Sequence, residues 1–390
     1  MRHFRHLAEA EAERLFAHRP QEFARSADVP TLSTALGASL YMPATRPEIV
    51  KDLRRQGAAG VMSMVICLED SIADSDLSAA EANVVEQLRM LPVDEQDADA
   101  IPLTFVRVRH PEQIPLLVDR LGEHAGILSG FVLPKFTPAT GPGYLDALAR
   151  VREATGLPLL AMPVIESPEV IHRESRVETL MGIKQLLDER RDLVLAVRLG
   201  ATDLSSAYAL RRDRDLTIYD VRLVSEVITD VVNILGRADG TGHVVTGPVW
   251  EYFPSQGRLF KPLLRQTPFA DDHEARELRR ELIVRDLDGL IREIVLDRAN
   301  GLTGKTVIHP THVAAVHALS VVTHEEHADA GDILADAAAD GGVQASSYRN
   351  KMNEAKPHRA WAERTMQRSR AFGVAAEDVT FVDLLLAAIG

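Results

Sequence analysis

Two carboxylates follow two apolar runs near the middle of the chain. Glu166 comes at the end of Leu-Leu-Ala-Met-Pro-Val-Ile-Glu-Ser, and Asp203 near the end of Leu-Val-Leu-Ala-Val-Arg-Leu-Gly-Ala-Thr-Asp-Leu. Each run is typical of a buried strand, and each acid lies where that strand gives way to a helix. Because neighbouring parallel strands end on one side, both acids are predicted to face one crevice, where carboxylate oxygens suit Mg²⁺. The alternative is that both acids only cap the helices that follow.

Charged residues recur at the ends of the other apolar runs. In chain order they are Arg46, Glu69, Asp70, Arg107, Arg109, Lys135 and His309. A barrel with a purely structural role would not require this clustering at one end of its strands. A lysine in such a place could form a Schiff base. His309 is interpreted as a structural histidine rather than a base.

The apolar runs alternate with helical patterns along most of the chain. The strand-like runs lie at 37–43, 60–68, 101–108, 130–134, 158–165, 193–200, 243–247 and 304–308. Helical patterns separate them, and a last helix begins near 311. Eight such units predict a closed (β/α)₈ TIM barrel of the α/β class rather than an open sheet. The absence of a Gly-x-Gly-x-x-Gly motif after an early strand also disfavours a dinucleotide-binding fold.

Segments at both ends of the chain fall outside this alternation. Apolar residues at helical spacing predict an N-terminal helix over 4–25, so residues 1–30 are assigned to an N-terminal helical segment and 31–325 to the barrel. Residues 326–390 are expected to form a C-terminal helical arm that contacts a neighbouring subunit. A long connection over 248–274 contains Arg258, Lys261 and Arg265, which would either bind a phosphorylated carrier or lie in a solvated loop.

Composition narrows the class of protein. The formal charge of −13 argues against nucleic acid or an anionic membrane as the main partner, although local basic clusters could still bind phosphates. The single cysteine, Cys67, lies in an apolar run and is interpreted as a buried structural thiol. With no disulfide framework and no apolar stretch near the ~20 residues that span a bilayer, we expect a cytoplasmic protein.

Several of these motifs, taken in order, resemble the citrate lyase β subunit and malyl-CoA lyase family of the HpcH/HpaI aldolase superfamily. The resemblance covers roughly 37–322 and the Lys351-Met352 segment, and a divergent branch is possible within it. It rests on Leu-Tyr-Met-Pro-Ala-Thr-Arg-Pro, Cys-Leu-Glu-Asp-Ser-Ile, Val-Arg-Val-Arg, Val-Leu-Pro-Lys, Ile-Glu-Ser, Gly-Ala-Thr-Asp-Leu and Gly-Lys-Thr-Val-Ile-His-Pro. Each motif alone is weak evidence for the family, whereas their order along the chain is specific to it.

The resemblance implies roles for the strand-end residues. Glu166 and Asp203 correspond to the ligands of Mg²⁺, which Mn²⁺ could replace, and Arg107 corresponds to the arginine that binds the substrate carboxylate. Arg109 replaces the usual asparagine, so it would either add a charge to the pocket or be exposed.

The remaining candidates have less specific roles. Glu69 and Asp70 would hold a metal-bound water, orient Arg107 or cap a helix. Arg46 would contact the nucleotide or phosphate part of a thioester, and Lys135 is a candidate substrate-binding residue. The run Asn-Lys-Met-Asn-Glu ending at Glu354 resembles the segment whose aspartate enters a neighbouring subunit's site as acid/base, and here a glutamate replaces that aspartate.

The resemblance predicts an Mg²⁺-dependent lyase that cleaves, or forms, a carbon–carbon bond of a 3-hydroxy acyl thioester, giving a 2-oxo acid and an acyl enolate. The thioester would be that of coenzyme A or an acyl carrier, and the assembly would be a homotrimer or a multiple of one. One alternative is a metal-dependent aldolase acting on free 2-oxo acids. Another is a non-catalytic ligand-binding or scaffold subunit.

Overall fold

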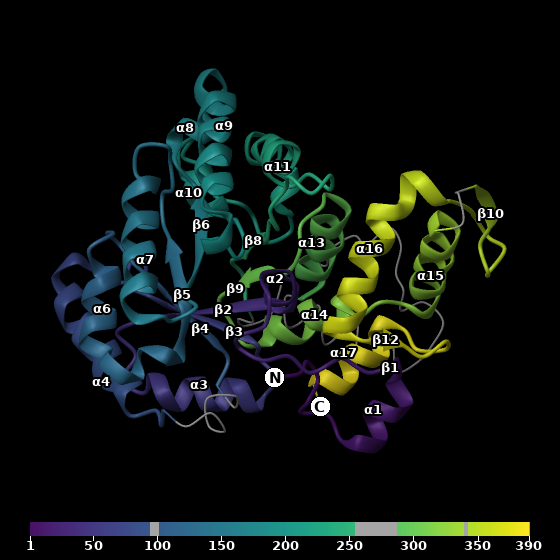
Figure 1. Cartoon of the computed structure of the whole chain (residues 1–390), viewed down its shortest axis with the longest axis horizontal. Coiled ribbons are helices and arrows are strands. Elements are labelled where there is room, and N and C mark those ends of the chain that lie inside the picture. The colour runs from purple at the N-terminus through teal and green to yellow at the C-terminus, as the bar shows by residue number, and fades with distance from the viewer. Residues whose placement is uncertain (94–100, 254–286, 339–341, 390) are drawn as a thin grey trace.

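The computed structural model describes residues 1–93, 101–253, 287–338 and 342–389 (Figure 1). Eight parallel strands form one sheet in the order β7-β6-β5-β4-β3-β2-β9-β8. A bridge between Val197 and Val245 brings the two edges of the sheet together and closes it into the predicted barrel. The strands are β2 (Ala38–Pro43), β3 (Ser63–Cys67), β4 (Leu103–Arg107), β5 (Leu128–Leu133), β6 (Leu160–Ile165), β7 (Arg198–Leu199), β8 (Gly247–Trp250) and β9 (Lys305–Val307).

Helices surround this barrel, as the alternating pattern predicted. They are α3 (Ile49–Ala58), α4 (Leu77–Arg89), α6 (Gln113–Leu121), α7 (Gly141–Thr155), α8 (Pro168–Ile171), α9 (Arg173–Glu189), α10 (Ala201–Ser206), α11 (Arg222–Leu235), α13 (Leu287–Ala299) and α14 (Thr311–Ser320). Side chains alternate across each strand, so Met64 and Ile66 of β3 pack in the apolar cluster of the helices. Val65 between them packs in a second cluster that contains Phe105 of β4.

The two ends of the chain meet beside the barrel. β1 (Phe16–His18) pairs antiparallel with β12 (Val374–Ala375). The N-terminal helix is shorter than the predicted 4–25, because α1 covers only Glu9–Leu15 and the chain then extends into β1. The remaining elements are α2 (Val29–Ala35), α15 (His324–Ala338), β10 (Val343–Ala345), β11 (Met352–Glu354), α16 (Ala355–Phe372) and α17 (Phe381–Ile389).

The C-terminal arm is partly integrated with the barrel and partly set to one side (Figure 1). α17 packs against α14, and α16 packs against α2. Phe372 and Leu385 are buried in the same apolar cluster as Phe105 of the barrel. None of the helices in the described ranges is long and apolar enough to cross a membrane.

Candidate active site

The parallel register aligns the strand ends that carry the predicted residues. Cys67 of β3 lies beside Arg107 of β4, and Arg107 lies beside Val132 of β5. On the next pair, Ile165 of β6 is level with Leu199 of β7. The residues that immediately follow these strands therefore gather at the C-terminal end of the barrel, which is where barrel enzymes place their chemistry.

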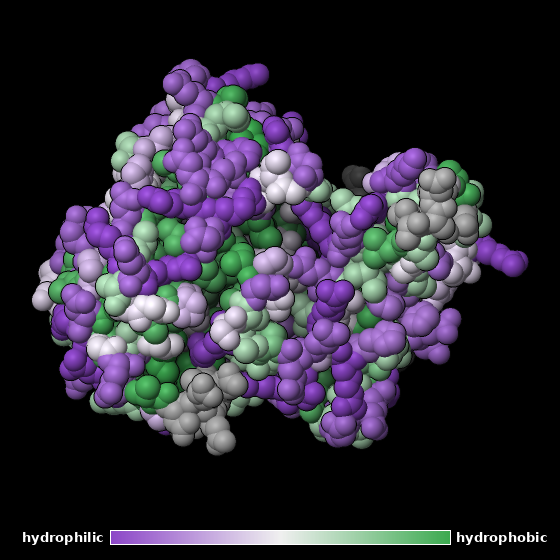
Figure 2. Space-filling view, in the orientation of Figure 1, coloured by the Kyte–Doolittle hydropathy of each residue, from purple (hydrophilic) through white to green (hydrophobic). Residues whose placement is uncertain are grey.

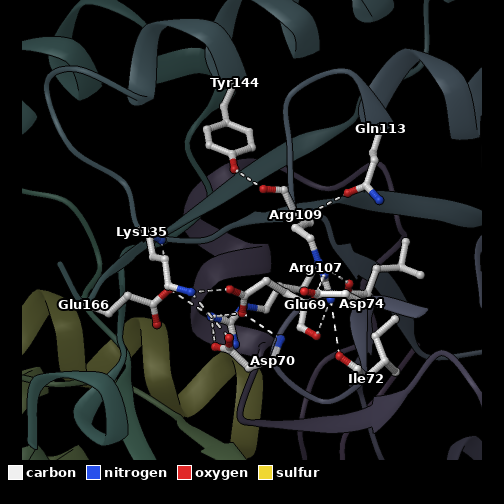
Figure 3. A network of polar contacts seen from close by, with 11 residues as sticks. Glu69, Asp70, Ile72, Asp74, Arg107, Arg109, Gln113, Lys135, Tyr144 and Glu166 are labelled. Atoms are coloured by element: carbon white, nitrogen blue, oxygen red, sulfur yellow. Dashed lines mark hydrogen bonds and ion pairs between the residues drawn. The ribbon is translucent and has the colours of Figure 1, made fainter. Parts of the chain in front are cut away.

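Arg107 lies at the centre of this gathering (Figure 3). Its Nη2 lies 2.8 Å from Glu69 Oε2, 2.9 Å from Glu166 Oε1 and 3.4 Å from Asp70 Oδ2. Burial alone would lower the pKa of the guanidinium, but the charge of Glu166, followed by Tyr41 and Glu69, raises it further above its ordinary value. Arg107 is thus a permanent cation held among three carboxylates.

Lys135 is the second cation of the site and has an unusual backbone. Its φ is +47°, a left-handed conformation that costs a non-glycine residue energy. This conformation directs its backbone N–H to Glu166 Oε1 at 2.9 Å while its Nζ lies 2.6 Å from Glu69 Oε1. Burial lowers the pKa of the ammonium, but the bond with Glu69 outweighs it and the net shift is upward. A protonated lysine favours binding of negative charge over Schiff-base chemistry.

Glu166 and Asp203 lie together, as the sequence predicted. Glu166 is 4% exposed, and Oε1 accepts hydrogen bonds from both Arg107 and the Lys135 backbone. Its other oxygen, Oε2, lies against Gly200, where a Cβ would come within 2.2 Å of it. The residue before α10 must therefore be glycine for Glu166 to occupy this place beside the helix that carries Asp203.

The pKa values of both acids lie above their ordinary values. Burial raises the pKa of Glu166 to about 7, against the charge of Arg107 and with the help of Asp203. Burial also raises the pKa of Asp203, and the charge of Asp70 adds to that shift. Because burial disfavours the charged forms of both carboxylates, a bound cation would stabilise their ionised state.

Glu69 and Asp70 lie just after β3 and affect each other's pKa. Burial and a hydrogen bond with Asp70 raise the pKa of Glu69. Burial would also raise the pKa of Asp70, but Glu69, Arg107 and Lys135 lower it below its ordinary range. Both acids therefore contact the two cations of the site instead of only capping a helix.

Arg109 is a positioning residue rather than an extra charge in the pocket. Its guanidinium donates to the backbone carbonyls of Leu68, Glu69 and Ile72, each at 3.3 Å, and pairs with Asp74 (Figure 3). The turn that carries Glu69 and Asp70 is thereby fixed to β4. Neither expectation from the sequence, an added pocket charge or an exposed side chain, describes this arrangement.

A residue without an assigned role in the sequence analysis lies inside the barrel. Arg198 of β7 is 1% exposed, donates to Ser39 Oγ at 3.1 Å and also to Thr306 Oγ1. Its guanidinium lies 5.5 Å from the centroid of the Tyr41 ring. Within the described ranges it has no carboxylate partner. The signal in the sequence was a charged residue inside an apolar strand.

Arg107, Glu69, Asp70, Lys135 and Glu166 form one group of contacts, the Arg107 cluster. Three predicted residues lie apart from it. The side chain of Arg46 pairs with Asp52 of α3 at 2.5 Å. His309 stacks on Phe253 and contacts Thr311, which fits its structural interpretation. Glu354 is exposed on β11, where its backbone N–H donates to His358. Arg258, Lys261 and Arg265 lie outside the described residues.

The donor set fits a hard divalent cation. Mg²⁺ is usually held by one or two carboxylates and keeps several waters, so the pair of Glu166 and Asp203 is sufficient. No group of three or more His, Cys, Asp or Glu side chains in metal-binding geometry occurs in the described ranges.

The chain belongs to the family of C–C bond lyases of the TIM-barrel fold, whose model matches residues 30–374. No curated protein sequence matches it. The fold is similar to that of a citrate lyase from Burkholderia xenovorans LB400, with a TM-score of 0.61 and 16% identity over 90% of this chain and 96% of that one. It is also similar to CitE from Mycobacterium tuberculosis in complex with magnesium, acetoacetate and coenzyme A, with a TM-score of 0.54 and 18% identity over 86% and 99%.

Proposed function

We propose that this protein is an Mg²⁺-dependent carbon–carbon lyase that cleaves a 3-hydroxy acyl thioester into a 2-oxo acid and an acyl enolate, or joins the two. The observation that carries the proposal is the Arg107 guanidinium, 2.9 Å from a buried glutamate that lies against a second acid. This arrangement supports a carboxylate-binding group beside a cation site. The CitE protein of similar fold binds magnesium, acetoacetate and coenzyme A, which supports the same ligand classes here.

Glu166 and Asp203 are the residues that would hold Mg²⁺. When bound there, the ion supplies Lewis-acid stabilisation of negative charge on substrate oxygens. Glu166 is held in place by the Lys135 backbone at 2.9 Å and by the space left at Gly200.

Arg107 would bind the carboxylate of the 2-oxo acid. Its Nη2 already contacts both Glu69 and Glu166, so the guanidinium is oriented before a ligand arrives. Two parallel charge-assisted hydrogen bonds would fix the orientation of the acid and hence of the bond to be broken. The Lys135 side chain, 52% exposed, would add a second positive charge at the pocket surface.

In the cleavage direction the carbon–carbon bond breaks and its electron pair stays on the acyl fragment as an enolate. The hydroxyl of the other fragment loses its proton and becomes the carbonyl of the 2-oxo acid. The enolate is then protonated on carbon. Glu354 of a neighbouring subunit is the candidate for this proton transfer, because in its own chain it is exposed on the arm and makes no described contact with the Arg107 cluster.

Replacement of Asp203 by asparagine tests the proposal. We expect Asp203→Asn to lower Mg²⁺-dependent cleavage or condensation by at least ~100-fold, because loss of a ligand costs at least as much as loss of an outer-shell partner. Asp192→Asn is the control, since the Asp192 side chain is 73% exposed and pairs at the surface with Arg152. Circular dichroism should show the same folded state for both. Full activity of Asp203→Asn would exclude the assignment.

The assay also separates the thioester from a free acid. Turnover of a 3-hydroxy acyl coenzyme A with no turnover of the corresponding free acid is the expected result. Equal turnover of the free acid would support the metal-dependent aldolase instead.

A further inference from the structure

A cavity of about 620 Å³ lies away from the Arg107 cluster, between the barrel and α16. Its barrel wall consists of residues 242–245, just before β8, and 301–304, just before β9. These are the N-terminal ends of the strands, so the cavity lies on the face of the barrel opposite the candidate active site. Figure 2 shows a hollow between the barrel and the arm with hydrophilic side chains along its rim.

Positive charge exceeds negative charge in this cavity. Arg298 of α13 and Arg368 of α16 share one carboxylate, with each guanidinium 2.7 Å from Glu326. The Nε of Arg368 is buried and has no hydrogen-bond partner in the described ranges. Burial, with Arg298 nearby, lowers the pKa of Arg368 to about 10. One carboxylate therefore compensates two guanidinium groups, one of them poorly solvated.

Two more arginines line the cavity without an ion-pair partner in the described part of the chain. Arg364 donates to the carbonyl of Gly236 at 3.2 Å, and Arg237 donates to the carbonyl of Asn233 at 2.9 Å. Of the nearby acids, Asp297 is held by Lys305 at 2.6 Å. Asp239 accepts hydrogen bonds from Thr241, which lower its pKa, and the charge of Arg237 lowers that pKa further.

An aromatic ring lies beside these cations. Trp361 is 41% exposed and also lines the cavity. It precedes Arg364 by three positions and Arg368 by seven on α16, so all three side chains lie on one face of the helix. The wall thus combines an exposed indole with a cluster of guanidinium groups, and aromatic bases stack on the former while phosphates bind the latter.

We propose that this cavity is a second ligand site, which binds a nucleotide with its phosphates on Arg298, Arg364 and Arg368 and its base on Trp361. Its volume falls in the range of small-molecule sites, ~300–1,000 Å³. Because the cavity lies at the other end of the barrel, a ligand here does not touch the reacting atoms. The site is independent of the reaction assigned to the C-terminal end.

Calorimetric titration with ADP tests this site. We expect ADP to bind the full chain and Arg364→Glu to weaken binding by at least ~10-fold, because a phosphate contact becomes a repulsion. Trp361→Leu should weaken ADP binding by ~10-fold through loss of stacking and should leave pyrophosphate binding unchanged. Tryptophan fluorescence gives a second readout, since Trp250 is fully buried and quenching therefore reports on Trp361.

Arg359→Glu is the matched control, because Arg359 lies on the same helix, pairs with Glu363 and does not line the cavity. Thermal melting should show that all variants are folded. The proposal is overturned if ADP at millimolar concentration does not bind, or if Arg359→Glu weakens binding as much as Arg364→Glu. It is also overturned if Arg107→Ala abolishes binding, which would place ADP at the catalytic end, or if Trp361→Leu has no effect on ADP.

Discussion

At the residue scale, the candidate site depends on a glycine, Gly200, at a position where a larger residue would not fit. The Glu166 carboxylate fits beside α10 only because position 200 has no Cβ. The strand-end position of Glu166 and Asp203 could be read from the sequence, but this contact could not, because it joins atoms of two different strands. The same holds for Arg198, which bonds to Ser39 and Thr306 across the barrel interior.

Gly200→Ala should therefore impair metal binding without unfolding the protein. The new Cβ would lie 2.2 Å from Glu166 Oε2, so the carboxylate must move. We expect Mg²⁺ affinity to fall by ~10–100-fold, the usual effect of disturbing a ligand's support. Gly331→Ala is the control, since a Cβ there meets nothing within 4 Å. Equal Mg²⁺ affinity of the two variants in a calorimetric titration would contradict the role of Gly200.

At the element scale, the alternation of apolar runs and helical patterns was enough to predict the barrel. Seven of the eight strands overlap their predicted runs closely, because a barrel strand is buried on both faces, by helices outside and by interior side chains within. The seventh run, 243–247, was placed too early: β8 is Gly247–Trp250 and includes the first residues of the predicted connection 248–274. The N-terminal helix was predicted too long, since helical spacing of apolar residues does not reveal that Phe16 pairs with Ala375 at the far end of the chain. The sequence also does not reveal which acid a given cation pairs with, as the pairing of Arg46 with Asp52 shows.

Buried histidines at the start of β2 predict a pH dependence of stability. The backbone N–H of Ala38 donates to His317 Nε2 at 3.3 Å, which requires neutral histidine. Burial, with His3 and His6 nearby, holds the pKa of His317 well below its ordinary value, and burial lowers the pKa of His3 to about 4. The unfolded chain then binds more protons, so stability is complete above about pH 6.5 and is lost as pH falls toward 4.

His317→Gln should flatten this acid dependence, because glutamine does not titrate. We expect a shallower loss of unfolding free energy between pH 6.5 and 4, and a stability at pH 7.5 lower by about 1 kcal/mol. Urea unfolding across this pH range measures both. The exposed His110, replaced by glutamine, is the control. If His317→Gln gives a curve parallel to the wild type, the histidine does not carry the dependence.

At the scale of the whole molecule, the position of Glu354 on the C-terminal arm bears on whether a single chain holds every residue that the reaction needs. Glu354 makes no described contact with the Arg107 cluster of its own chain, so a catalytic role for it requires a neighbouring subunit. Deleting the arm would not test this cleanly, because Phe372 and Leu385 are part of a core shared with the barrel. Point variants leave that core intact.

Mixing two inactive variants tests the shared site. Glu354→Gln and Asp203→Asn should each be inactive alone, whereas co-expressed chains should recover on the order of a quarter of wild-type turnover, since random assembly pairs an intact barrel with an intact arm that often. Light scattering should show an oligomer for each variant. Wild-type activity of Glu354→Gln, or no recovery in the mixture, would remove Glu354 from the mechanism.

Calorimetric titration of Mg²⁺ in the presence of oxaloacetate or glyoxylate tests the central claim most directly, because it asks whether the Glu166–Asp203 pair and Arg107 form one binding site. The account predicts that Mg²⁺ binds the wild type more tightly with the 2-oxo acid present. It also predicts that Asp203→Asn abolishes Mg²⁺ binding, and that Arg107→Ala removes only the enhancement by the acid. Binding of Mg²⁺ to Asp203→Asn with wild-type affinity, or no Mg²⁺ binding by the wild type with either acid, would contradict it.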